Sequence, residues 1–228
     1  DKTYEADICF GFETNTGDIE GKIISESINN FNQVDLSSVL ESFEGTQTQT
    51  PPMYSALKYK GQPLYKFARR GIHLERKPRA ITVYNFSMTS LSESSANFEI
   101  TCSRGTYIRT IAHDFGERLG CGAHVSALRR LGVGPFKIDQ AVTLSTVETI
   151  LQNSGFPGLD KILLPSDTAV EHLQSVSFCS DAVKSLRNGR SVKSSKRLGD
   201  GPLRLYDHDN NLFGIGRVDQ NGLIAPRR

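Results

Sequence analysis

The stretch that decides the fold is CSRGTYIRT, Cys102–Thr110. Before it, residues 96–102 alternate apolar and polar side chains, which predicts a half-buried strand. After it, apolar residues recur every four positions from Ile111 to Leu119, and Gly120 follows, which predicts a helix that ends there. A strand therefore runs through a glycine-containing turn into a helix.

Tyr107 and Arg109 stand two positions apart at this junction. If the backbone is still extended there, both side chains leave from the same face. A ring and a guanidinium together suit a flat anionic ligand, because the ring stacks on a base and the guanidinium binds a carboxylate or phosphate. The alternative is a strand-end tyrosine packed on the core beside a surface charge, and the spacing alone leaves both open.

Composition describes an ordinary globular protein, with 228 residues of which 37% are hydrophobic and 23% charged. No apolar run approaches the length of a membrane span, and no signal peptide is visible. The four cysteines form no C-x-x-C pair and have no histidine at ligand spacing, so we expect no zinc site. We expect reduced thiols and a cytoplasmic protein.

Charge is distributed unevenly along the chain. Residues 1–48 hold 2 basic and 10 acidic side chains, a net of −8, and residues 49–228 hold 25 basic and 15 acidic side chains, a net of +10. An acidic front and a basic remainder indicate a surface that faces a polyanion. The alternative is the chance unevenness of a soluble protein.

Residues 50–79 differ in kind from the rest, because aromatic and basic side chains are interleaved there. Aromatic faces stack on bases while neighbouring cations meet phosphates, so the mixture fits looped or single-stranded RNA. The alternative is a short helix, begun by Pro63 and ended by Gly71, with aromatic residues inside and cations outside. The residues are Tyr54, Lys58, Tyr59, Lys60, Tyr65, Lys66, Phe67, Arg69 and Arg70.

The remaining patterns predict an α+β chain. Residues 4–12 and 80–88 alternate as strands, and the second should pair antiparallel with residues 96–102. Residues 144–151 have helical spacing, which the glycines and proline of residues 153–158 should break. From about residue 173 short strands and turns predominate, which predicts a small β-barrel-like module. His124 is interpreted as a hydrogen-bonded structural histidine rather than a catalytic base.

Seven stretches taken in order resemble the TruB family of bacterial tRNA pseudouridine-55 synthases. Each stretch is weak alone, but together they run over essentially the whole chain. They are residues 1–4 (DKTY), 14–21 (TNTGDIEG), 52–58 (PMYSALK), 102–109 (CSRGTYIR), 119–124 (LGCGAH), 128–130 (LRR) and 225–228 (APRR).

The resemblance implies a fold and a reaction. The fold would be a mixed, largely antiparallel sheet with flanking helices, in a pseudouridine synthase domain over 1–172 with an RNA-binding insertion at 50–79. A PUA-like RNA-binding domain would follow at 173–228. The reaction would isomerise the uridine of the tRNA T-stem-loop by breaking the N-glycosidic bond and rejoining the sugar at C5. It would need no cofactor and no metal, and nothing demands more than a monomer.

The resemblance also assigns roles. Tyr4 and Tyr107 match the pocket tyrosines, one to stack on the flipped base and one to act in deprotonating C5. Arg109 matches the arginine that pairs with the catalytic aspartate and keeps it ionised. Leu128 would line the pocket for the base, and the target base must first be flipped out of the RNA loop to enter it. The RNA contacts would come from Tyr54, Lys58, Arg69, Arg70, Arg129 and Arg130.

One family feature has no counterpart in the sequence. The nucleophilic aspartate stands in a Gly-x-Leu-Asp motif upstream of the strand that holds Tyr4, and no aspartate here has that context. We therefore expect an N-terminally truncated member that is inactive alone. A non-catalytic RNA-binding protein or tRNA chaperone is the alternative, and a guide-RNA-dependent archaeal or eukaryotic relative is a weaker one.

Overall fold

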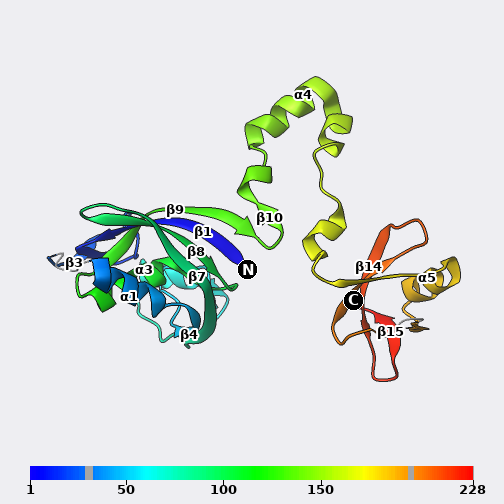
Figure 1. Cartoon of the computed structure of the whole chain (residues 1–228), viewed down its shortest axis with the longest axis horizontal. Helices are drawn as coiled ribbons and strands as arrows, with labels where there is room; N and C mark the ends of the chain where they lie inside the picture. The colour runs from blue at the N-terminus through cyan, green and yellow to red at the C-terminus, as the bar shows by residue number, and fades with distance from the viewer. Residues whose placement is uncertain (29–32, 195–197, 228) are drawn as a thin grey trace. The chain divides into compact units, whose positions relative to one another are not determined.

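The computed structural model describes residues 1–28, 33–194 and 198–227, in two compact units that comprise 1–140 and 141–228 (Figure 1). The first unit is built on a six-stranded antiparallel sheet. In spatial order its strands are β10 (Phe136–Lys137), β9 (Ala123–Val133), β1 (Lys2–Phe10), β8 (Ser95–Cys102), β7 (Arg79–Leu91) and β4 (Gly45–Gln49). This confirms the predicted α+β class with a largely antiparallel sheet.

The other elements of this unit are helices and two short ribbons. The pairs β2 with β3 and β5 with β6 form separate two-stranded sheets. Their bounds are β2 (Phe12–Thr14), β3 (Ile23–Glu26), β5 (Lys58–Tyr59) and β6 (Gln62–Pro63), and the helices are α1 (Gln33–Glu41), α2 (Leu64–Ala68), α3 (Ile108–Leu119) and the short η1 (Ile138–Gln140).

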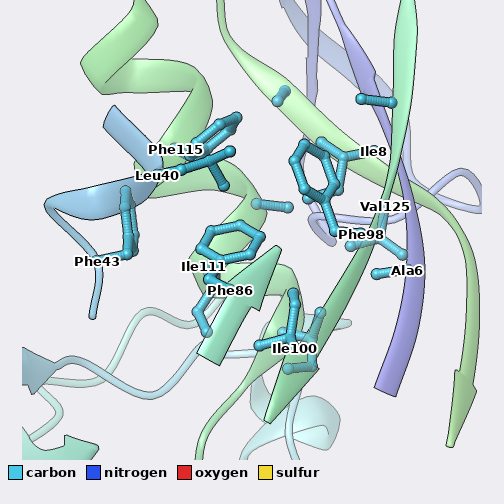
Figure 2. Packing of buried hydrophobic residues seen from close by; sticks show 14 of the residues in the cluster. Ala6, Ile8, Leu40, Phe43, Phe86, Phe98, Ile100, Ile111, Phe115 and Val125 are labelled. Atoms are coloured by element: carbon cyan, nitrogen blue, oxygen red, sulfur yellow. The ribbon is translucent and has the colours of Figure 1, made fainter. Parts of the chain in front are cut away.

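The core lies between the sheet and helices α1 and α3 (Figure 2), and Phe115 of α3 makes four ring contacts in it. Its ring is fully buried, with centroids 5.4 to 6.2 Å from those of Phe10, Phe43, Phe86 and Phe98. Such tilted and edge-to-face pairs add to the stability that burial alone supplies. The helix that begins beside Tyr107 is therefore fixed on the sheet by its middle turn.

The predicted strand–turn–helix junction is confirmed. β8 ends at Cys102, α3 begins at Ile108, and Gly120 ends the helix in the left-handed conformation (φ 74°). Tyr107 is the N-cap and is extended (φ −102°, ψ 111°). The condition of an extended backbone fails at Arg109, because that residue already lies in the first turn of α3.

Two other local predictions for this unit are confirmed. β7 and β8 pair antiparallel across the turn before Ser95. Pro63 is the N-cap of α2, which suits its missing N–H and its fixed φ. His124 is buried, and its Nδ1 lies 3.1 Å from the carbonyl oxygen of Phe12, which fits the structural interpretation.

The second unit contains a long helix, α4 (Leu144–Asp160), and a five-stranded sheet. The prediction that residues 153–158 break the helix is confirmed, because the backbone of Gly155 within α4 is not helical (φ 61°, ψ −161°) and two helical segments meet there at a kink. The sheet order is β11 (Gln174–Ser177), β13 (Pro202–Tyr206), β14 (Leu212–Val218), β15 (Leu223–Pro226) and β12 (Val192–Lys193), accompanied by α5 (Ser180–Arg187) and η2 (Ser166–Val170).

The sheet of this unit has its own core. Leu203, Leu205, Leu186 and Ile224 are almost fully buried there. Tyr206 Oη donates a hydrogen bond to Asp167 Oδ2 (2.5 Å), which ties η2 to β13. The domain boundary at residue 172 stays a prediction. In the part of the chain that the structure describes, no helix combines the length and apolarity needed to cross a membrane.

Candidate active site

Arg109 is the most firmly held charged side chain at the start of α3. One Nη1–H group donates to Asp18 Oδ2 (2.8 Å) and another to the carbonyl oxygen of Thr16 (3.0 Å), and Nη2 donates to the carbonyl oxygen of Tyr54 (2.7 Å). The Arg109 and Asp18 side chains are 25% and 28% exposed. Three oxygen atoms from two distant segments therefore fix the guanidinium while leaving part of it open.

The loop that presents Asp18 is itself rigidly bonded. Thr16 Oγ1 donates to Asp18 Oδ1 (2.6 Å), and Thr14 Oγ1 donates to the Asp18 carbonyl oxygen (2.7 Å). Gly17 has φ 74°, and a Cβ there would lie 3.3 Å from Arg109 Cβ. Glycine thus allows both the left-handed turn and the close approach of the loop to α3.

Gln49, the last residue of β4, binds the backbone of Tyr107. Its Oε1 accepts the Tyr107 N–H (2.8 Å), and its Nε2 donates to the Tyr107 carbonyl oxygen (3.1 Å). The Gln49 side chain is only 4% exposed. A buried amide thus holds the residue at which strand geometry changes to helix geometry.

Two cavities meet at Arg109. The larger, 620 Å³, is lined by Tyr107, Arg109, Tyr54 and Arg69 among others. The second, 470 Å³, is lined by Arg109 and, one turn further along α3, by Asp114. Burial raises the pKa of the Asp114 carboxyl above its ordinary value, although the neighbouring His113 opposes the shift.

The larger cavity has the size of a nucleotide pocket, because small-molecule sites span about 300 to 1,000 Å³. Its walls combine aromatic rings, the Arg69 and Arg109 cations and the Asp18 carboxylate. Ser55 also lines it, and its buried Oγ has no hydrogen-bond partner among the described residues. The arrangement can stack a base and bind a phosphate or sugar oxygen.

Tyr4 and Leu128, the other predicted pocket residues, line neither of these two cavities. Tyr4 is 8% exposed and belongs to the same buried cluster as Ile108, the first residue of α3. Leu128 pairs with Ala6 across β9 and β1 and is 47% exposed. The structure therefore brings Tyr107 and Arg109 together and leaves these two residues on the adjoining sheet.

The aromatic-basic segment supplies one wall of the larger cavity. Tyr54 and Arg69 line it, and the Arg69 guanidinium lies 5.3 Å from the centre of the Tyr65 ring. Lys58 instead lines a separate 180 Å³ pocket, and Arg70 is exposed at the end of α2. The helical alternative holds in part, since α2 is short and its cations are exposed, but it buries Leu64 rather than its aromatic residues, which are only half-buried. RNA binding by this segment stays a prediction.

Arg129 and Arg130 lie on the exposed half of β9, opposite Glu5 and Tyr4 of β1. The Arg130 guanidinium lies 5.5 Å from the centre of the Tyr4 ring. A cation–π interaction of this kind stabilises the position of the ring by about 0.5 to 1 kcal/mol at an exposed site. Arg130 thus covers the ring of Tyr4, the predicted pocket tyrosine that lies on the sheet.

Sequence reasoning missed Asp18 and Gln49. The pattern at residues 14–18 indicates a turn, and no local signal shows that Asp18 faces a residue 91 positions further on. Gln49 stands in a polar run of threonines and glutamines, where nothing distinguishes it from Gln47. A match to a family motif could have identified Asp18 as a site residue, but only the fold identifies Gln49.

One group in the described part of the chain could bring metal ligands together. The ligand atoms of His113, Asp114 and Glu117 approach within 4.8 Å of one another. His113 and Glu117 form an i,i+4 pair of 3.8 Å, which helices form without any ion. The group lies on one turn of α3, with His113 and Asp114 partly buried and Glu117 exposed, and it identifies no metal site.

Family models match the chain over nearly its whole length. Residues 1–108 match the TruB family pseudouridylate synthase N-terminal domain, and residues 109–171 match the tRNA pseudouridylate synthase B C-terminal domain. Residues 175–228 match the C-terminal domain of pseudouridine synthase II TruB.

Curated relatives agree with these matches. The chain is 41% identical over 228 residues to tRNA pseudouridine synthase B of Pseudomonas fluorescens (strain Pf0-1), which covers 100% of the chain and 75% of that protein. It is 40% identical over 229 residues to the protein of the same name from Nitrosococcus oceani, and the match covers 100% of this chain and 74% of that protein.

Solved structures share the fold. A Cbf5–Nop10–Gar1 complex superposes with a TM-score of 0.71 at 23% identity, covering 100% of this chain and 65% of that one. A chain of an H/ACA RNP bound to a substrate RNA superposes with a TM-score of 0.68 at 20% identity, and the match covers 100% of this chain and 64% of that one. This chain thus spans just under two thirds of the length of those two chains.

Proposed function

Because this chain belongs to the TruB family of pseudouridylate synthases, we propose that it converts uridine 55 in the T-stem-loop of tRNA to pseudouridine. The single observation that carries the proposal is the full-length similarity, at about 40% identity, to proteins named tRNA pseudouridine synthase B. Those relatives favour an enzyme over a non-catalytic RNA-binding protein or chaperone.

The geometry supports this reaction through the larger cavity. Its 620 Å³ can admit one flipped nucleotide, with Tyr107 available to stack on the base and Arg109 to bind an acidic group. In the proposal Tyr107, Arg109 and Tyr4 act on the uridine and Leu128 bounds the base. Arg130 supports the inclusion of Tyr4, because its guanidinium lies over that ring, which belongs to the same buried cluster as Ile108.

RNA outside the pocket would meet the basic side chains around it. Tyr54 and Arg69 line the cavity, and Lys58 and Arg70 extend the same segment. Arg129 and Arg130 would add contacts along β9. Phosphate contacts dominate the affinity of such surfaces and make it salt-dependent.

The domain division belongs to the same proposal. A PUA-like RNA-binding domain over 173–228 is supported by the family match to 175–228 and by a sheet that begins at Gln174. The catalytic part would be 1–172. We propose that the protein works as a monomer in the cytoplasm, where its four free cysteines would remain thiols.

The test uses a T-stem-loop hairpin labelled with tritium at C5 of the target uridine. Joining the sugar to C5 releases the hydrogen at that carbon, so isomerisation appears as tritium in water. The product of the complete coding sequence is expected to release it. Binding of the hairpin without any release would instead support the non-catalytic alternative.

A binding measurement tests the RNA surface of the 228-residue chain itself. Arg69→Gln should lower the slope of log affinity against log salt by about 0.7 to 0.9, the share of one phosphate contact. Lys161→Gln, an exposed cation at the end of α4, is the control and should leave the slope unchanged. Equal slopes for both variants would remove Arg69 from the RNA surface.

A further inference from the structure

Gln49 replaces a missing capping group at the start of α3. The N-cap residue Tyr107 has no side-chain cap, and its own N–H lies outside the helical hydrogen-bond ladder. The Gln49 amide accepts that N–H and donates to the carbonyl of the same residue, as one strand does to another. The two residues are 58 positions apart, so the contact is tertiary.

The Tyr107 carbonyl also begins the helix. It accepts the N–H groups of Thr110 and Ile111, each at 3.1 Å. A shift of this peptide would therefore move the first turn of α3, which carries Arg109. Gln49 resists such a shift because it is 4% exposed and is anchored opposite Arg79 in the β4–β7 ladder.

The same segment grips the site a second time. Five residues after Gln49, the Tyr54 carbonyl accepts Arg109 Nη2. Residues 49–54 thus hold the backbone of Tyr107 at one end and the guanidinium of Arg109 at the other. Both side chains line the 620 Å³ cavity.

We propose that Gln49 is a positioning residue, whose side-chain amide sets the start of α3 so that Tyr107 and Arg109 face the same substrate. The inference rests on the proposed function. Gln49 lies outside the lining of both cavities that meet at Arg109, so it would act through the two residues it positions. Misplacement of reacting groups by about 1 Å can cost about a hundredfold in rate without a matching loss of binding.

Two substitutions separate the parts of the contact. Gln49→Met keeps the length of the side chain and removes both hydrogen bonds. Gln49→Glu keeps an acceptor for the Tyr107 N–H and loses the donor to its carbonyl. Gln47→Met is the matched control, because Gln47 lies on the same strand and its Nε2 donates to the Phe43 carbonyl (2.6 Å), away from the site.

Turnover, RNA affinity and hydrogen exchange are measured on the product of the complete coding sequence. For Gln49→Met we expect kcat to fall by about 10- to 100-fold, Kd for the hairpin to change less than threefold, and the Tyr107 amide to exchange at least tenfold faster. Gln49→Glu is the second variant should Gln49→Met fail to fold. Its kcat is expected to lie between those of Gln49→Met and the wild type at a pH where the buried carboxyl is protonated and can donate to the Tyr107 carbonyl, and to fall further once the carboxyl ionises. Gln47→Met should change none of the three by more than threefold.

The outcomes separate this inference from the proposed function. A kcat of Gln49→Met and Gln49→Glu equal to that of Gln47→Met would overturn the positioning role, as would unchanged exchange of the Tyr107 amide. If the wild type releases no tritium, the proposed function fails, and the exchange measurement still decides whether Gln49 fixes the helix start.

Discussion

Replacing Arg109 with methionine tests the structural account of the site most directly. The substitution keeps an unbranched side chain and removes the three hydrogen bonds to Asp18, Thr16 and Tyr54. Two backbone carbonyls and one carboxylate oxygen then lose their donor. We expect the first unit to become less stable and the loop around Asp18 to loosen.

The magnitude follows from the contacts. Each hydrogen bond to a carbonyl contributes about 1 kcal/mol net. The Arg109–Asp18 ion pair is about one quarter exposed on each side, so solvent screening limits it to about 0.5 to 1 kcal/mol. The free energy of unfolding should therefore fall by about 2 to 3 kcal/mol.

Urea unfolding followed by circular dichroism measures this loss. The chain has two compact units, and a destabilised variant of the Phe115 core identifies which transition belongs to the first. Arg70→Met is the matched control, since the exposed Arg70 side chain makes no hydrogen bond to the described residues. A double-mutant cycle with Asp18→Asn should give a coupling of about 0.5 to 1 kcal/mol.

Two results would refute this reasoning. If Arg109→Met lowered the free energy of unfolding by less than about 0.5 kcal/mol, and by no more than Arg70→Met does, the three contacts would not hold the guanidinium. A coupling of zero would mean that Asp18 adds nothing to the two carbonyls.

Three further predictions concern the packing and ionisation of the first unit and the chain's thiols. Phe115→Ala should lower its free energy of unfolding by about 3 to 5 kcal/mol in urea titrations, since it empties the centre of four ring contacts. Because burial raises the pKa of Asp114, the folded state binds that proton more tightly than the unfolded state, and stability falls as pH rises from 3.8 through the raised value. Asp114→Asn should therefore raise the midpoint of thermal unfolding near neutral pH, and it should raise that midpoint less in acid. In thiol labelling with a coloured disulfide, exposed Cys179 should react first, and Cys102 and Cys121, whose pKa values burial raises, should react last.

Local patterns predicted the elements of the first unit well. The alternation of residues 96–102, the four-residue spacing after Ile111 and the stop at Gly120 each correspond to an observed element. They succeed because strand and helix periodicity record which face is buried. The break predicted at residues 153–158 corresponds to the kink of α4 at Gly155, since glycine and proline disfavour a continuous helix.

The site was predictable only where a motif carries it. Tyr107 and Arg109 stand two positions apart in the sequence and share a cavity, so one stretch identifies both. Asp18 and Gln49 meet them from 91 and 58 positions away, through contacts that depend on strand order and register. Periodicity reports burial but not partners, and a turn aspartate or a polar strand residue has the same local signature in any fold.

The separations at this site have a consequence for how the protein is made. Asp18 and Gln49 leave the ribosome before Tyr107 and Arg109 are synthesised, so their partners at the start of α3 do not exist until then. A nascent chain stalled ahead of α3 would contain the loop and the strand end but no pocket. Under the proposed function, recognition of RNA through this pocket would therefore begin only after translation has passed the junction at Cys102–Thr110.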